Sequence, residues 1–286
     1  MAKTTQKTNL QKIITRFFSR RISVIGLFVF CLILLLAVFG DLICPYSPTK
    51  IIARDRFQGP NPVHIFGTDD MGRDTFARII DGARLTLLIS GGSVLISLFF
   101  GTLLGLLAGY RQGKLDTIIS GLMDSLWAFP AIVLAMAIRA ALGASISNII
   151  IAIGVANIPD FYRIVRSRVI SVREMEYITG AYAIGLNDRQ IIFRYVLPNI
   201  LSTLIVQVTL TAAKAALAEA SLSFLGLGVP LPQASWGTML KSGYALMRRT
   251  IWLSVFPGIF IMLLIISLNF LGDGLRDALD LRIRTD

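Results

Sequence analysis

Apolar stretches without charge follow one another along the chain, separated by short polar segments. Five contain no Asp, Glu, Lys or Arg: residues 22–40, 85–110, 140–159, 195–213 and 250–272. A sixth, residues 117–138, contains only Asp124. Each is close to the roughly 20 residues that a helix needs to cross a bilayer. The alternation of a membrane β-barrel is absent, so the pattern predicts an all-α integral membrane protein with six transmembrane helices.

This pattern divides the chain into consecutive segments. We expect a basic cytoplasmic segment over residues 1–21, a first transmembrane helix over 22–43, an extracytoplasmic loop over 44–84, a five-helix core over 85–275 and a cytoplasmic tail over 276–286. Most connections between elements run about 4–6 residues. The two long loops, residues 44–84 and 161–194, are therefore the expected places for function.

Composition and charge support a membrane protein. The chain of 286 residues is 55% hydrophobic and only 16% charged, whereas soluble domains carry about a quarter charged residues. This argues against a soluble globular enzyme. The net charge of +11 does not favour nucleic-acid binding, because the basic residues flank apolar stretches instead of forming one stripe with interleaved aromatic residues.

Basic residues also predict the orientation in the membrane. Lys3, Lys7, Lys12, Arg16, Arg20 and Arg21 precede the first apolar stretch, with no acidic residue among them. Since Lys and Arg near short loops mark the cytoplasmic side, we expect the N-terminus inside. Alternation then places the loop 161–194 and the tail inside, and the loop 44–84 outside.

The end of the outer loop has an amphipathic pattern. Over residues 75–87, Phe76, Ile79, Ile80 and Ala83 share one helical face, and the opposite face is charged. We expect this stretch to rest at the membrane interface.

Two features concern the predicted spans themselves. Gly101, Gly105 and Gly109 recur every four residues, a spacing that lets helices approach closely. Pro130 lies inside the stretch 117–138, and we expect it to kink that helix by removing one backbone hydrogen bond.

Ionisable residues inside predicted spans are candidates for a polar pathway through the membrane, because burying charge in hydrocarbon is costly. These candidates are Asp124, Lys214 and Glu219. Lys214 and Glu219 are five residues apart, about 140° around a helix, and so do not share a face. Helix packing or pairing with a partner remains the alternative for all three. We expect Arg139 to extend to the outer surface.

The cytoplasmic stretch 173–198 predicts two short helices around a break. Tyr177, Ala181 and Ile184 recur on one face, widened by Ile178 and Tyr182. An apolar face in contact with water is unfavourable, so we expect another molecule to cover it. Spacing alone leaves two possibilities open, another protein or the lipid headgroups.

The break itself has recognisable end signals. Gly185 is placed for the left-handed position that closes a helix, and Asn187 with Gln190 resembles a capping box. A second helix holding Ile191, Ile192 and Tyr195 should follow. We call residues 173–198 the coupling elbow.

The coupling elbow resembles the cytoplasmic loop of ABC-importer permeases, whose pattern is Glu-Ala-Ala, three residues, Gly, nine residues, Ile, one residue, Leu-Pro. Gly185, Leu197 and Pro198 fall in register. Here Thr179, Gly180 and Ala181 replace the triplet, and Tyr195 replaces the Ile. The resemblance implies contact with an ATPase by Glu176, Tyr177, Thr179, Gly180, Ala181, Ile184, Gly185, Asn187, Ile191, Tyr195, Leu197 and Pro198.

Two further stretches narrow the family. Residues 66–87 and 217–228 are similar to signatures of the second permease subunit of dipeptide, oligopeptide and nickel importers. In the first, the residues that carry the resemblance are Gly67, Thr68, Asp69, Gly72, Arg73, Asp74, Gly82 and Arg84. The resemblance implies the fold of a type I importer permease in a bacterial cell membrane, importing peptides or, as an alternative, nickel or another metal complex.

The resemblance also implies partners: a homologous second permease subunit, two ATPase subunits and an external binding protein. The chain lacks a G-x-x-x-x-G-K-[ST] loop, so ATP and Mg²⁺ are expected on the partner ATPases, with no cofactor on this chain.

Two alternatives of other classes are a membrane enzyme and a passive channel. With one histidine, His64, no Ser/His/Asp or Cys/His catalytic set can be assembled, and no metal site is evident around Cys31 or Cys44. A passive channel would leave the coupling elbow unexplained.

Overall fold

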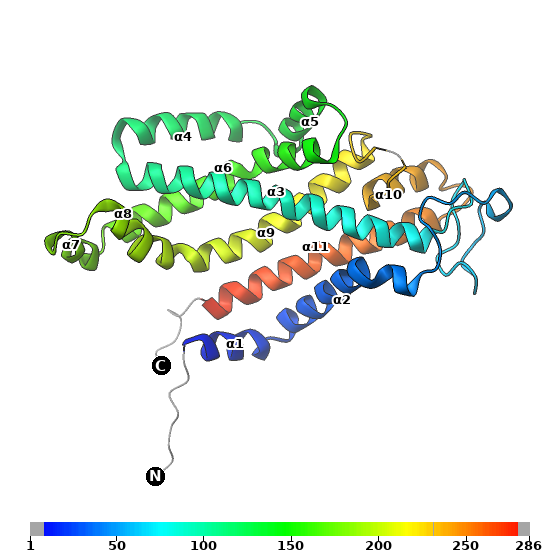
Figure 1. Cartoon of the computed structure of the whole chain (residues 1–286), viewed down its shortest axis with the longest axis horizontal. Helices are drawn as coiled ribbons and strands as arrows, with labels where there is room; N and C mark the ends of the chain where they lie inside the picture. The colour runs from blue at the N-terminus through cyan, green and yellow to red at the C-terminus, as the bar shows by residue number, and fades with distance from the viewer. Residues whose placement is uncertain (1–8, 231, 280–286) are drawn as a thin grey trace, which may run out of the picture.

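The computed structural model describes residues 9–230 and 232–279, most of which lie in helices (Figure 1). Within these residues the only β-pairing is a single antiparallel bridge between Thr68 and Asp74. The outer parts of the predicted basic segment and tail, residues 1–8 and 280–286, lie outside the described residues. A short amphipathic helix, α1 (Asn9–Ser19), precedes the first long helix.

Five helices are long and apolar enough to cross a membrane in the part of the chain that the structure describes. They are α2 (Arg21–Ile43), α3 (Thr75–Arg111), α6 (Ile146–Arg173), α9 (Leu197–Phe224) with the turns that precede it, and α11 (Trp252–Leu279). The chain is thus an all-helical membrane protein.

The sixth predicted span is not one straight or gently kinked helix. Residues 117–138 fall on α4 (Gly113–Trp127) and α5 (Ala131–Leu142), which meet at 91°. Pro130 is the N-cap of α5. A proline has no N–H to donate and disfavours helical geometry at the preceding residue, so the break is sharper than the expected kink. Six spans result if this bent pair counts as one.

The expected interfacial helix over residues 75–87 is a second correction. These residues are the first turns of α3, which continues without a break to Arg111. Ile79 and Ala83 are fully buried. The indole of Trp236, on α10 (Trp236–Ala245), donates to the carbonyl of Ile79 at 2.9 Å. The apolar face is therefore covered by protein instead of lipid.

The most extensive helix pairing is between α3 and α6. A Cβ placed on Gly101, Gly105 or Gly109 would lie 2.4–2.9 Å from atoms of α6. This is closer than real Cβ contacts allow, so the glycine spacing expected from the sequence brings the two backbones together. The main buried cluster, which includes Ile89 and Phe161, lies along this pair.

Most connections between the long helices lie at two opposite ends of the molecule, whereas the α4–α5 bend and α5 lie between these ends (Figure 1). One end holds α1, the α3–α4 turn, α7 (Glu176–Ala183) and α8 (Asp188–Ile191). The other end holds residues 44–74, with the short 3₁₀ turn η1 (Ala53–Asp55), and α10. The segments expected on the cytoplasmic side thus share one end, and the expected outer loop lies at the other.

Candidate functional site

The coupling elbow closes its first helix at Gly185. The residue has φ +87°, in the left-handed region, where a side chain would be strained. The N–H of Leu186 donates to the carbonyl of Ala181 at 3.2 Å, and that of Gly185 to the carbonyl of Tyr182 at 2.9 Å. These two bonds form a Schellman motif, which satisfies the last carbonyls of α7.

The second half of the elbow begins at a capping box. Asn187 Oδ1 accepts from the N–H of Gln190 at 2.9 Å, and Gln190 Oε1 accepts from the N–H of Asn187 at 3.0 Å. The helix that follows is not a separate short one, as the sequence suggested. It passes from α8 through a π-helical turn, η2 (Ile192–Val196), directly into α9. Movement of the elbow would therefore reach α9 without an intervening loop.

Part of the predicted apolar face of the elbow is buried in the protein, and part is exposed on its surface. Ile178, Ala181 and Ile191 are buried in the chain's own core, so Ala181 and Ile191 are not available to a partner. Ile184, by contrast, is 75% exposed. Helical spacing alone did not distinguish the buried apolar residues from the exposed one. The remaining expected contact residues are exposed or half-buried: Glu176, Tyr177, Thr179, Gly180, Gly185, Asn187, Tyr195, Leu197 and Pro198.

A hydrogen-bonded group that the sequence did not indicate ties the elbow to α3. The hydroxyls of Tyr110 and Tyr182 are 2.6 Å apart, and each lies 3.2 Å from Asp188 Oδ1. Each phenol has one proton to donate, so one hydroxyl donates to the other, which in turn donates to the carboxylate. Tyr110 stands 72 residues before Tyr182, and no local pattern links them.

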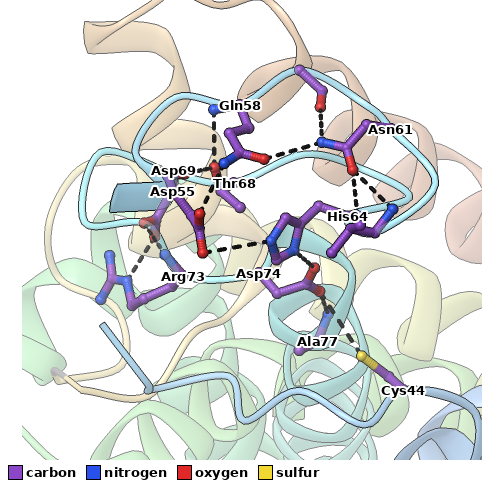
Figure 2. A network of polar contacts seen from close by, with 12 residues as sticks. Cys44, Asp55, Gln58, Asn61, His64, Thr68, Asp69, Arg73, Asp74 and Ala77 are labelled. Atoms are coloured by element: carbon purple, nitrogen blue, oxygen red, sulfur yellow. Dashed lines mark hydrogen bonds and ion pairs between the residues drawn. The ribbon is translucent and has the colours of Figure 1, made fainter. Parts of the chain in front are cut away.

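At the opposite end, residues of the outer-loop signature form a closed polar network (Figure 2). Asp69 Oδ1 accepts from the backbone N–H groups of Met71 and Arg73, both at 2.9 Å, and Oδ2 accepts from Arg73 Nε at 2.6 Å. Thr68 bonds the backbone of Gln58. Gly72 has φ +77° and sits where a Cβ would meet the carbonyl of Ile52 at 1.9 Å.

Asp74 joins this network to the first turn of α3. Its Oδ1 caps the helix by accepting from the N–H of Ala77 at 2.7 Å, and its Oδ2 is 2.8 Å from His64 Nδ1 (Figure 2). Cys44 Sγ lies 3.9 Å from Asp74 Oδ1. Burial raises the pKa of the Cys44 thiol, and the nearby carboxylate adds to the effect. The network holds the loop on the helix N-terminus, where a carboxylate is favoured.

The remaining signature residues also make contacts within the chain. Gly67 turns with φ +73°. Gly82 packs beside the ring of Trp236. Arg84 donates to the carbonyl of Ala37 at 2.5 Å and pairs with Asp41 at 2.9 Å, fixing α3 to α2.

Two of the three candidate pathway residues converge on one place, where the α4–α5 bend faces α6 and α9. Asp124 is 2.6 Å from Arg163 Nη2, and Lys214 Nζ is 2.8 Å from Asp160 Oδ2. Trp127 connects the two ion pairs. Its indole Nε1 is 3.4 Å from Asp160, and the guanidinium of Arg163 lies 3.7 Å from its ring centroid.

Glu219 lies apart from this cluster and is fully buried. Its carboxylate accepts from Thr86 at 3.2 Å and from Ser223 at 2.7 Å, and Ser223 is reached in turn by Ser235. The residue therefore connects α3, α9 and the N-terminus of α10. This arrangement resembles a packing contact more than a pathway lining.

Arg139 does not extend to the surface as expected. It is buried, and its guanidinium donates to the carbonyl of Gly143 and, at 3.3 Å, to that of Gly228. Carbonyls at the end of α5 and after α9 thus supply acceptors inside the protein for two of its guanidinium nitrogens, while the buried Nε has no partner among the described residues. Within the described residues, no three His, Cys, Asp or Glu side chains converge as metal ligands.

Comparison with known proteins identifies the family. Residues 101–285 match the family described as binding-protein-dependent transport system inner membrane component, and residues 8–60 match the N-terminal TM domain of oligopeptide transport permease C.

Individual relatives align over nearly the whole chain. The dipeptide transport system permease protein DppC of Alkalihalophilus pseudofirmus is 45% identical over 93% of this chain and 87% of its own length. The oligopeptide transport system permease protein OppC of Bacillus subtilis is 36% identical over 94% of this chain and 88% of its own. The glutathione transport system permease protein GsiD of Pectobacterium atrosepticum is 39% identical, covering 94% and 90%.

Proposed function

Because the chain belongs to the family of binding-protein-dependent transport system inner membrane components, we propose that it is a permease subunit of an ATP-driven importer of di- or oligopeptides. It is a multi-pass protein of the bacterial cell membrane and a transport subunit, not an enzyme. A permease of this ABC importer family works with ATPase subunits and an external binding protein.

The observation that carries the proposal is the construction of the coupling elbow. Its inner face is packed into the chain's own core, and its outer face leaves Ile184 open to a partner. It runs without a break into α9, and through Tyr182 and Asp188 it bonds to the end of α3. A push on the elbow would therefore move two long helices together.

This coupling supports a two-state mechanism. ATP and Mg²⁺, bound by the partner ATPases, draw those subunits together, and the elbow transmits the movement to α9 and α3. The pathway then opens on the other side. Such a switch requires that each ligand bind one state better than the other, and the docked elbow is where the nucleotide-dependent movement acts.

The substrate class follows from the relatives. Those named above are described as transporting dipeptides, oligopeptides or glutathione. We therefore favour peptides over nickel or another metal complex. We also propose that a homologous second permease pairs with this chain, so that the two together enclose the pathway, with each contributing one half.

Co-purification with the ATPases tests the docking directly. In the proposed importer, Ile184→Asp places a charge on the exposed apolar surface of the elbow. We expect the purified permease to lose its ATPase subunits and ATP-dependent peptide uptake. Ile51→Asp is the matched control, because Ile51 is also an exposed isoleucine but lies in the outer loop, at the opposite end.

Two results would count against the proposal. One is a wild-type permease, solubilised with its membrane partners, that carries no ATPase subunit. The other is equal ATPase retention in the Ile184→Asp and Ile51→Asp variants, which would place docking elsewhere.

A further inference from the structure

A hollow of about 470 Å³ lies beside the two ion pairs, between the α4–α5 bend, α6 and α9. We call it the mid-span hollow. Trp127, Pro130, Asn157, Asp160, Lys214 and Leu217 are among its lining residues. Small-molecule sites commonly measure about 300–1,000 Å³ and combine apolar walls with a few polar groups. The mid-span hollow matches this description in size and in lining.

Its charged groups lie far from both ends of α6. Asp160 stands near the middle of that helix, and at about 1.5 Å per residue it is about 20 Å from each end. Lys214 and Asp160 both keep part of their surface open, with side-chain exposures of 62% and 24%. Exposed charge within a membrane-spanning helix is costly where it meets lipid. Their open surface must therefore face water or another polar group.

Two ion pairs lie around the hollow, and only one of them lines it. Arg163 is held by Asp124 and by the ring of Trp127, and neither Arg163 nor Asp124 is among the lining residues. Lys214 and Asp160 do line the hollow, where they present one cation and one anion joined by a single 2.8 Å contact. The lining is therefore neutral overall, with both signs of charge exposed.

We propose that the mid-span hollow is a dipeptide subsite in which Lys214 receives the terminal carboxylate and Asp160 the terminal ammonium, while Trp127 and Leu217 contact the side chains. This inference rests on the proposed function and adds the residues that bind the substrate. When a zwitterionic peptide binds, the ion pair between Lys214 and Asp160 is replaced by two ion pairs with the peptide termini. No charge is then left unpaired. A bare metal cation would meet Lys214 as a like charge.

This replacement of one ion pair by two is also compatible with a transport pathway. When the peptide leaves, Lys214 and Asp160 pair again, so neither state has an unpaired charge at mid-span. Because the two residues pair with each other in the empty site, release of the peptide leaves no unpaired charge. Such a subsite binds the peptide briefly and releases it readily.

Photo-crosslinking in the complete importer tests the location. The probe is the dipeptide alanyl-p-benzoylphenylalanine, delivered by the binding protein and irradiated during ATP turnover in proteoliposomes. We expect adducts on the lining of the hollow, in residues 126–135, 153–160 or 214–218. Adducts confined to other segments of this chain, or absent from it, would overturn the proposal.

Two lysine variants test the chemistry. Lys214→Met should lower the adduct yield about tenfold, the loss expected for one charged contact, and Lys214→Arg should restore most of it. Lys241→Met is the matched control, because Lys241 is exposed on α10 and is not among the lining residues. An unchanged adduct yield in Lys214→Met contradicts the proposal. If that variant does not assemble, the wild-type adduct map decides.

The same experiment separates this inference from the proposed function. A wild-type importer that takes up no peptide contradicts the proposed function. A wild-type importer that takes up the probe but yields no adduct in the hollow contradicts only the peptide subsite.

Discussion

Several charged residues in the helices pair with residues of other helices. Asp124 pairs with Arg163, Asp160 with Lys214, and Asp116 with Arg166 through two contacts of 2.6 Å. Arg139 and Glu219 instead use neutral groups, carbonyls in the first case and hydroxyls in the second. Since unpaired charge is costly in hydrocarbon, these contacts both stabilise the bundle and define which helices are neighbours.

Glu219 gives a stability prediction at this scale. Glu219→Ala leaves the buried hydroxyls of Thr86 and Ser223 without their acceptor. We expect the free energy of unfolding of the purified protein to fall by about 1–3 kcal/mol, the usual cost of unsatisfied buried polar groups. Thermal unfolding in detergent measures the change.

Ser221→Ala is the control for that measurement, because the Ser221 hydroxyl bonds only the carbonyl of Leu217 on its own helix. It should change the free energy by less than about 0.5 kcal/mol. Equal stability of the Glu219→Ala variant and the wild type would show that the carboxylate contributes no net stabilisation.

At the scale of elements, helix ends determine how the coupling elbow is built. The Schellman motif at Gly185 and the capping box at Asn187 fix the angle between α7 and α8 through local hydrogen bonds. The π-helical turn and α9 then follow directly. The elbow is thus one rigid corner at the end of a long helix.

Gly185 provides the prediction for this element. Gly185→Ala forces a side chain into the left-handed region, at a cost of about 1–2 kcal/mol. The corner should distort, and more ATP should be hydrolysed for each peptide imported; Gly185→Trp should increase the effect. The ratio of ATP hydrolysis to uptake in proteoliposomes is the measurement.

Gly121→Ala is a matched control, because Gly121 is not among the expected ATPase contacts. It has the same open surroundings, with no atom within 4 Å of an added Cβ, but it lies inside α4 and does not have a positive φ. Alanine there should leave the ratio unchanged. If both variants behave alike, the left-handed backbone at Gly185 is not what couples the elbow to transport.

At the scale of the whole molecule, the two ends have different roles. The elbow stands at one end and the loop of residues 44–74 at the other (Figure 1). The mid-span hollow is lined by residues of the α4–α5 bend, α6 and α9. In the proposed importer these positions correspond to the ATPases, the binding protein and the substrate in transit.

Cysteine labelling tests this arrangement. With Cys31 and Cys44 replaced by serine, Thr49→Cys marks the outer loop and Arg189→Cys marks the elbow. A membrane-impermeant maleimide added to spheroplasts should label Thr49→Cys at once, and Arg189→Cys only after permeabilisation. The opposite pattern would invert the orientation that the basic residues predict.

Local patterns in the sequence determined the helical class, the long apolar helices, the left-handed turn at Gly185, the capping box at Asn187 and the close packing of α3 through its glycines. Each depends on residues within one or two helical turns, or on the composition of one stretch. The resemblance of the elbow and the outer loop to known signatures also indicated the family.

Only the tertiary structure decided which face of a helix meets which neighbour. It buried the first turns of α3 under Trp236 and Arg139 inside the protein. It placed part of the elbow in the core and part at the surface. It also brought Asp124 and Lys214 together with Arg163, Asp160 and Trp127. These contacts join helices far apart in the chain. Helical periodicity assigns a residue to a face of its own helix, whereas the neighbour on that face depends on how all the helices pack together.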